Sequence, residues 1–278
     1  MMSLLPFHWH LVEVLVLVLA TLLHRVVVTD PSQRRFALGG LVALLAVTVW
    51  PFGDLAASVS LTAATVQRLV IMLFVAPMLL LATPVPVLAR LTRRAPVDWV
   101  TRHLAHPGLA MILVTVTGTL TLSVPIVDFG ARSSIGRDLI VLSTITTGLI
   151  LWIPALGVLP GAKRLSAAAR AGYVFASALV VTSLSFVWIF AQHPLYPALQ
   201  HQYALLHLTP LFDQQLAGFV AKLGCYLPMW IVAFLIFFHA EDQGVPVEDT
   251  PLHWADVERE LERVDRQRAR TLRRHRPQ

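Results

Sequence analysis

Seven long apolar stretches dominate this chain of 278 residues and limit what it can fold into. A helix needs about 20 apolar residues to cross the roughly 30 Å hydrocarbon core of a bilayer. A membrane β-barrel would need strands that alternate between polar and apolar residues, and no long stretch does so. The sequence therefore predicts an all-α fold, a polytopic membrane helical bundle of about seven transmembrane helices. The predicted spans are residues 9–28, 36–53, 57–82, 107–127, 138–158, 171–191 and 213–239.

Basic residues mark the predicted cytoplasmic side of the membrane. They gather after the first, third and fifth spans and in the C-terminal tail, and only Arg132 and Arg137 fall on the other side. By the positive-inside rule, the N-terminus lies outside and the C-terminus inside. We expect residues 1–240 to form the transmembrane domain and residues 241–278 a charged, helical cytoplasmic tail. The arginine-rich segment 84–106 is typical of an amphipathic helix at the interface.

Several classes of protein are disfavoured by composition. The net charge of +6 does not indicate a nucleic-acid partner, because the basic residues lie at span ends and in the tail, where membrane anchoring explains them. The single cysteine, Cys225, excludes an intrachain disulfide and a cysteine-rich metal site. Residues 1–10 contain no Lys or Arg, so the first apolar run is interpreted as a retained span rather than a signal peptide.

Ionisable residues at membrane depth are few and form a predicted buried polar network. They are Glu13 in the first span, Arg68 beside Gln67 in the third, and Lys222 in the last. An isolated ion costs several kcal/mol there, so each should face the bundle interior and find a partner. Glu13 can pair with Arg68 or with Lys222. Either a structural ion pair or a polar cavity open to the outside fits these residues.

Histidines cluster on the predicted outer side. Imidazole suits both copper and zinc, so these residues are candidate metal ligands. Their spacing matches no helical metal motif, however, and interfacial histidines also occur as plain membrane-boundary residues. The outer histidines are His8, His10, His193, His201 and His207.

The connector before the last span is the most distinctive polar segment. Pro194 and Tyr196 lie in a Pro-Leu-Tyr-Pro run, and the last span opens with Asp-Gln-Gln-Leu-Ala-Gly at residues 213–218. Asp213 is expected to cap the first turn of that span. Gln214 and Gln215 then stand at the outer edge of the bundle, above Lys222.

These segments resemble the CtaG family of caa-type cytochrome c oxidase assembly factors. The resemblance rests on the run from Asp213 to Gly218, the Pro-Leu-Tyr-Pro run, the His-Trp-His at residues 8–10 and the Trp-Ile-Pro-Ala-Leu-Gly at residues 152–157. It covers residues 7–240. It implies a protein of the bacterial plasma membrane that helps to supply the copper B site of an oxidase. The implied partners are oxidase subunits, other assembly factors and membrane lipid, with copper as the candidate cofactor.

The chain departs from the family at the intramembrane histidines that the resemblance implies. Only Gln67 of the third-span motif is kept. If those histidines bind copper in relatives, this chain has lost the ligands, and a metal-free role becomes a serious alternative. The corresponding residues here are Ala64, Arg68, Ser123, Arg137 and Val141.

The leading functional hypothesis is a non-enzymatic assembly factor for a respiratory oxidase. The alternatives are a small-solute or metal transporter and a structural subunit of a respiratory complex. No inverted repeat favours a transporter, and no nucleophile–base pair favours an enzyme. The soft ligands for Cu(I) inside the spans are Met72, Met78, Met111 and Met229.

Overall fold

The computed structural model describes residues 30–92, 95–159, 165–199 and 208–242. Every regular element in these ranges is helical, so the all-α prediction is confirmed there. The chain divides into two compact units, residues 1–237 and residues 238–278. The first predicted span, residues 9–28, and most of the tail lie outside the described residues.

Four described helical segments are long and apolar enough to cross a membrane without a sharp bend. The first comprises α4 (Leu61–Val70), the π-helical turn η2 (Ile71–Val75) and α5 (Ala76–Ala82). The second is α10 (Ser134–Leu156), and the third combines α11 (Ala167–Val181) with α12 (Ser185–Ile189). The fourth is α13 (Pro210–Asp242). These segments match four of the predicted spans as candidate membrane-crossing helices.

Two further predicted spans are bent pairs of helices. Helix α2 (Pro31–Thr48) meets α3 (Phe52–Ser58) at 55°, and α8 (Pro107–Thr121) meets α9 (Val124–Arg132) at 59°. The predictions of single spans over 36–53 and 107–127 missed these bends. With each pair counted as one span, the described residues hold up to six spans. The seventh span and the orientation of the chain stay predictions.

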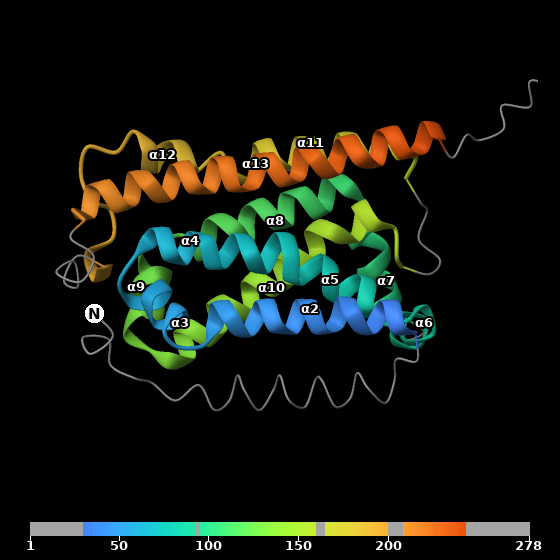
Figure 1. Ribbon diagram of the computed structural model, residues 1–278, viewed down its shortest axis with the longest axis horizontal. Helices are drawn as coiled ribbons and strands as arrows, with labels where there is room; N and C mark the ends of the chain where they lie inside the picture. Colours follow the sequence, from blue (N-terminus) through green and yellow to red (C-terminus); the bar gives the residue numbers. More distant parts are fainter. Residues whose placement is uncertain (1–29, 93–94, 160–164, 200–207, 243–278) are drawn as a thin grey trace, which may run out of the picture. The chain divides into compact units, whose positions relative to one another are not determined.

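The predicted amphipathic segment 84–106 is helical but divided into two elements. Helix α6 comprises Val85–Thr92 and α7 comprises Ala95–Leu104. Both lie at the end of the bundle opposite to α3, α9 and α12 (Figure 1). The arginine-rich segment 84–106 therefore lies at the opposite end of the bundle from the bends between α2 and α3 and between α8 and α9.

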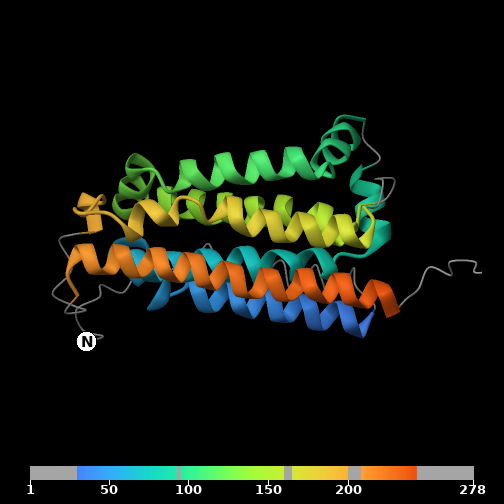
Figure 2. The same cartoon turned by 90° about the horizontal axis from the view of Figure 1, so that it is seen from above.

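Helix α10 lies at the centre of the packing. It contacts α8, α9, α11 and the segment formed by η2 and α5, and α2 packs against α5; the long helices run alongside one another in both views (Figure 2). Small residues permit this close packing, as is common between membrane helices. A Cβ added at Gly148 would lie 2.7 Å from the Cβ of Ala76. Alanines 76, 110, 155 and 178 are completely buried.

The π-helical turn has a chemical cause in Pro77. Proline has no N–H group, and its ring clashes with the preceding turn of an α-helix. In η2 the Ala76 N–H bonds to the carbonyl of Ile71, so the next carbonyl, that of Met72, would need the missing N–H of Pro77. The indole Nε1 of Trp152 donates to the Met72 carbonyl at 2.8 Å instead. One side chain of α10 thus stabilises the irregular turn.

Candidate functional site

The helix breaks at one end of the bundle leave backbone groups without helical partners. Polar side chains from distant parts of the sequence supply the missing bonds. We call this set the capped rim. It consists of Ser60, Tyr196, Asp213, Gln214 and Gln215, with the apolar residues Leu61, Trp188, Leu199 and Ala217 packed together beneath them.

Asp213 caps α4. One carboxylate oxygen accepts from the Leu61 N–H at 2.7 Å, and the other accepts from the Ser60 hydroxyl at 2.8 Å. Its carbonyl also accepts from the Thr62 hydroxyl at 2.9 Å. At the start of α13 the Thr209 hydroxyl accepts from the Phe212 N–H at 3.3 Å, and Asp213 lies in the first turn of that helix. A buried carboxylate at a helix N-terminus is stabilised by the helix dipole.

Tyr196 closes the end of α8. Its hydroxyl donates to the carbonyl of Leu122 at 2.8 Å and accepts from the indole Nε1 of Trp188 at 3.0 Å. The Leu122 carbonyl is one of the groups that the break between α8 and α9 leaves free. Burial raises the pKa of Tyr196 to about 12, against smaller lowering effects of the Trp188 bond and the Arg68 charge. The phenol is therefore neutral and available as a donor at physiological pH.

The proline-rich connector is attached to α13 through Gln214, Gln215 and Gly218. The side-chain oxygen of Gln214 accepts from the Leu195 N–H at 2.7 Å, and Nε2 of Gln215 donates to the Ala191 carbonyl at 3.2 Å. A Cβ added at Gly218 would lie 2.7 Å from Cγ1 of Ile189. The absence of a side chain at Gly218 thus lets α12 and α13 touch. Pro194 lies in the same connector, next to the bonded Leu195.

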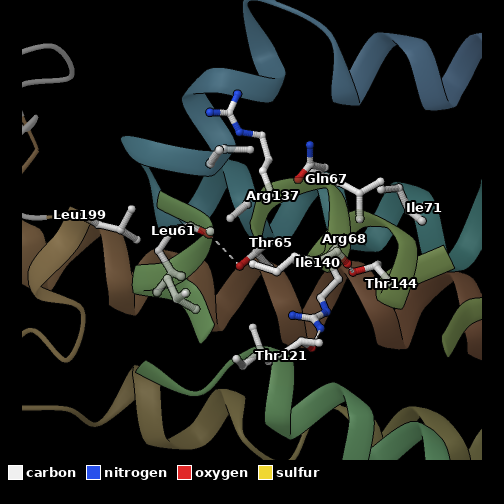
Figure 3. A pocket seen from close by; sticks show the side chains of 17 residues that line it. Leu61, Thr65, Gln67, Arg68, Ile71, Thr121, Arg137, Ile140, Thr144 and Leu199 are labelled. Carbon is white, nitrogen blue, oxygen red and sulfur yellow. Dashed lines mark hydrogen bonds between the residues drawn. The ribbon is translucent and has the colours of Figure 1, made fainter. Parts of the chain in front are cut away.

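A cavity of about 70 Å³ lies next to the capped rim, between residues of α3, α4, α9 and α10 (Figure 3). Four of the five positions at which the sequence resemblance implies histidine line it. They are Ala64, Arg68, Arg137 and Val141, whereas Ser123 is the N-cap of α9. Among the residues that the structure describes, those lining the cavity include no His, Cys, Asp, Glu or Met. This donor set does not fit a copper ion.

Arg137 forms a buried ion pair that the sequence prediction missed. Its guanidinium lies 2.6 Å from a carboxylate oxygen of Asp54, and the side chains are 17% and 3% exposed. The pair joins α10 to α3. Both residues had been assigned to connectors, and they are 83 positions apart in sequence. The sequence did contain a signal for this pair, because Asp54 and Arg137 fall in two connectors on the same predicted side of the membrane.

The structure places the described members of the predicted polar network, Gln67, Arg68 and Lys222, against different partners. Nε2 of Gln67 donates to the Val47 carbonyl at the end of α2, at 2.6 Å. Arg68 extends instead toward α8, where its guanidinium donates to the hydroxyl of Thr121. The ammonium of Lys222 lies 3.8 Å from the ring centre of Phe186. Glu13 lies outside the described residues, so its pairing stays a prediction.

The predicted outer metal site is also largely outside the described residues. His193 is exposed, while His8, His10, His201 and His207 fall in ranges that the structure does not describe. Within the described part of the chain, no three His, Cys, Asp or Glu side chains gather as a metal site would require. The Cys225 thiol and the Met229 sulfur lie 3.4 Å apart in the core.

Comparison with known protein families identifies a family for most of the chain. A family model described as cytochrome c oxidase caa3 assembly factor (Caa3_CtaG) matches residues 14–242. The matched range contains the capped rim and the cavity with both arginines. No curated protein and no solved structure matches the chain.

Proposed function

Because the chain belongs to the cytochrome c oxidase caa3 assembly factor family, we propose that it assists the assembly of a cytochrome c oxidase by contact within the membrane. The observation that carries this proposal is the family match over residues 14–242, which includes every described span. We propose further that the role is non-catalytic and that the partners are oxidase subunits or other assembly factors.

The proposed location is the bacterial plasma membrane, with the N-terminus outside. Several apolar helices of span length support a multi-pass membrane protein. Large apolar side chains are exposed along α13, among them Leu223, Leu227 and Ile231. Lipid and the membrane segments of oxidase subunits are the surroundings that suit such a surface.

The bent helices do not favour the transporter alternative. In transporters, broken helices leave backbone groups free to bind substrate or ion. Here the end of α2 is bonded by Gln67, and the end of α8 by Tyr196. These breaks are closed by the protein's own side chains, which supports an architectural role for them.

Copper delivery is a second candidate function, and we place its ligands outside the cavity. The family description names an oxidase assembly factor, and the described residues that line the cavity include none whose side chain binds copper well. The remaining candidates are the outer histidines His8, His10, His193, His201 and His207. Elemental analysis after Cu(I) loading should find copper that is lost when all five are replaced. Absence of copper from the loaded wild-type protein would reject this second function.

Deletion of the gene tests the assembly function. Membranes of the deletion strain should contain less assembled oxidase, measured by haem difference spectra and by oxidase activity, and expression of the chain should restore both. The variant Asp30→Asn serves as a control, because Asp30 is an exposed cap of α2 away from the capped rim. A deletion strain with the wild-type amount of assembled oxidase would contradict the proposal.

A further inference from the structure

We propose that Arg68 binds a small monovalent anion of the halide class inside the bundle. The inference is independent of the assembly function. It starts from the position of Arg68 in α4, within the segment Leu61–Ala82 that is long and apolar enough to cross the membrane. A charge at such depth requires compensation from a partner.

The side chains around Arg68 only partly compensate the positive charge of its guanidinium. Arginine carries five N–H donors and no acceptor. Among the described residues, its hydrogen-bond partner is the neutral hydroxyl of Thr121. That hydroxyl also donates within its own helix, to the carbonyl of Thr117 at 2.9 Å. The carboxylates found in ion pairs within the described ranges, Asp54 and Asp128, bond to other arginines.

Space for an anion exists on two sides of Arg68. The cavity next to the capped rim and a second cavity, also of about 70 Å³, both include Arg68 and Thr65 in their linings. A water molecule needs about 10–15 Å³ measured in this way, so either cavity has room for several water-sized guests. The second cavity is lined by Trp188 as well, and Arg68 is its only charged lining residue among those that the structure describes.

The charges and donors around the first cavity favour an anion over a cation. Among the described residues, its charged lining residues are Arg68 and Arg137, and Asp54 pairs with Arg137. The Nε atom of Arg137 is buried and has no acceptor among the described residues. In Figure 3 the guanidinium of Arg68 points toward Thr121, whereas the guanidinium of Arg137 points away from Thr121. We therefore place the anion at Arg68, with Arg137 adding to the positive field.

The hydroxyl groups near Arg68 do not compete for this role. Thr65 donates to the Leu61 carbonyl, and in the second cavity Thr182 and Ser185 donate to backbone carbonyls of their own segment. Among the described residues, the Arg68 guanidinium is consequently the strongest donor that lines both cavities. A single halide ion at the guanidinium would balance the charge of Arg68.

Iodide quenching of tryptophan fluorescence tests the proposal directly. The probe is sodium iodide, exchanged against sodium gluconate at constant ionic strength, with the full chain in detergent micelles. Exposed tryptophans such as Trp99, which is 63% exposed, should give only a linear background. Trp188 should add a saturable component, because it lines the second cavity with Arg68. Trp188→Phe and Arg68→Met should each abolish the saturable component.

The thermal stability of the same protein gives a second readout. Chloride in place of gluconate should raise Tm in a saturable way, because a ligand that binds only the folded state stabilises it. Arg132→Gln is the matched control, since Arg132 is exposed and pairs weakly with Asp128 at 3.9 Å; it should keep the chloride effect. If Arg68→Met fails to fold, Arg68→Lys should fold and bind the halide at least several-fold more weakly.

Two results would overturn the inference. The first is that the wild-type chain shows no response to chloride or iodide, whereas Glu13→Gln shows one. Glu13 would then be the counter-ion of Arg68. The second is a saturable response that persists unchanged in Arg68→Met. A saturable halide response that depends on Arg68 and is unaffected by Glu13→Gln supports the proposal.

Discussion

At the scale of single residues, the polar side chains of this membrane protein mainly complete the backbone of other helices. Asp213 bonds the start of α4, Tyr196 bonds the end of α8, and Gln67 bonds the end of α2. In an apolar bundle an unsatisfied backbone group costs several kcal/mol. These residues therefore matter most for the folded state, and substitutions should be measured first as changes in stability.

Replacement of Asp213 should be strongly destabilising. Asp213→Ala removes the acceptor of the Ser60 hydroxyl and of the Leu61 N–H, both of which are buried. Leaving such donors unsatisfied costs about 1–3 kcal/mol each. Tm in detergent should fall by several degrees or more, whereas Asp30→Ala at the exposed cap of α2 should cost about 1 kcal/mol. Equal shifts for the two variants would contradict this account of Asp213.

The Asp54–Arg137 pair allows a comparison of buried and exposed ion pairs in one chain. Asp54→Asn or Arg137→Gln alone should destabilise by about 3–5 kcal/mol, because each leaves an uncompensated charge in the bundle. The double variant should recover part of this loss. The longer Arg132–Asp128 pair, in which Arg132 is 75% exposed, should contribute less than about 1 kcal/mol. A double-mutant cycle on unfolding checks the coupling, and additive single effects would show that the pair is not coupled.

At the scale of helices, hydropathy predicted most spans because it measures the property that places a helix in lipid. It did not predict the bends between α2 and α3 or between α8 and α9, because the apolar run continues through both. The contacts of the capped rim were also beyond sequence reasoning. Asp213 and Ser60 are 153 positions apart, and nothing local to either residue identifies the other. The network expected around Glu13 remains untested.

Two glycines in neighbouring helices should respond oppositely to alanine. A Cβ at Gly218 would lie 2.9 Å from the Ser185 carbonyl and 2.7 Å from Ile189, so Gly218→Ala should push α13 away from α12 and lower Tm. A Cβ at Gly172 in α11 meets nothing within 4 Å, so Gly172→Ala should be neutral or stabilise by up to about 1 kcal/mol. Thermal unfolding of the two variants side by side checks this, and a tolerated Gly218→Ala would contradict the close contact.

At the scale of the whole molecule, the family motif and the cavity have separate roles. The motif residues Asp213 to Gly218 hold the connector, α12 and the start of α4 against α13 in the capped rim. The cavity next to it carries two arginines where the sequence resemblance implies metal-binding histidines. The chain thus keeps the frame of the assembly-factor family while its cavity favours an anion.

The central claim, that the motif is architectural in a factor for oxidase assembly, is tested most directly in the deletion strain. That strain would express Asp213→Ala at several levels, and assembled oxidase would be measured against the amount of folded chain. The account predicts that oxidase falls only in proportion to the folded chain, as it does with limiting wild type. Folded Asp213→Ala at the wild-type level without assembled oxidase would contradict it, because Asp213 would then act on the oxidase itself.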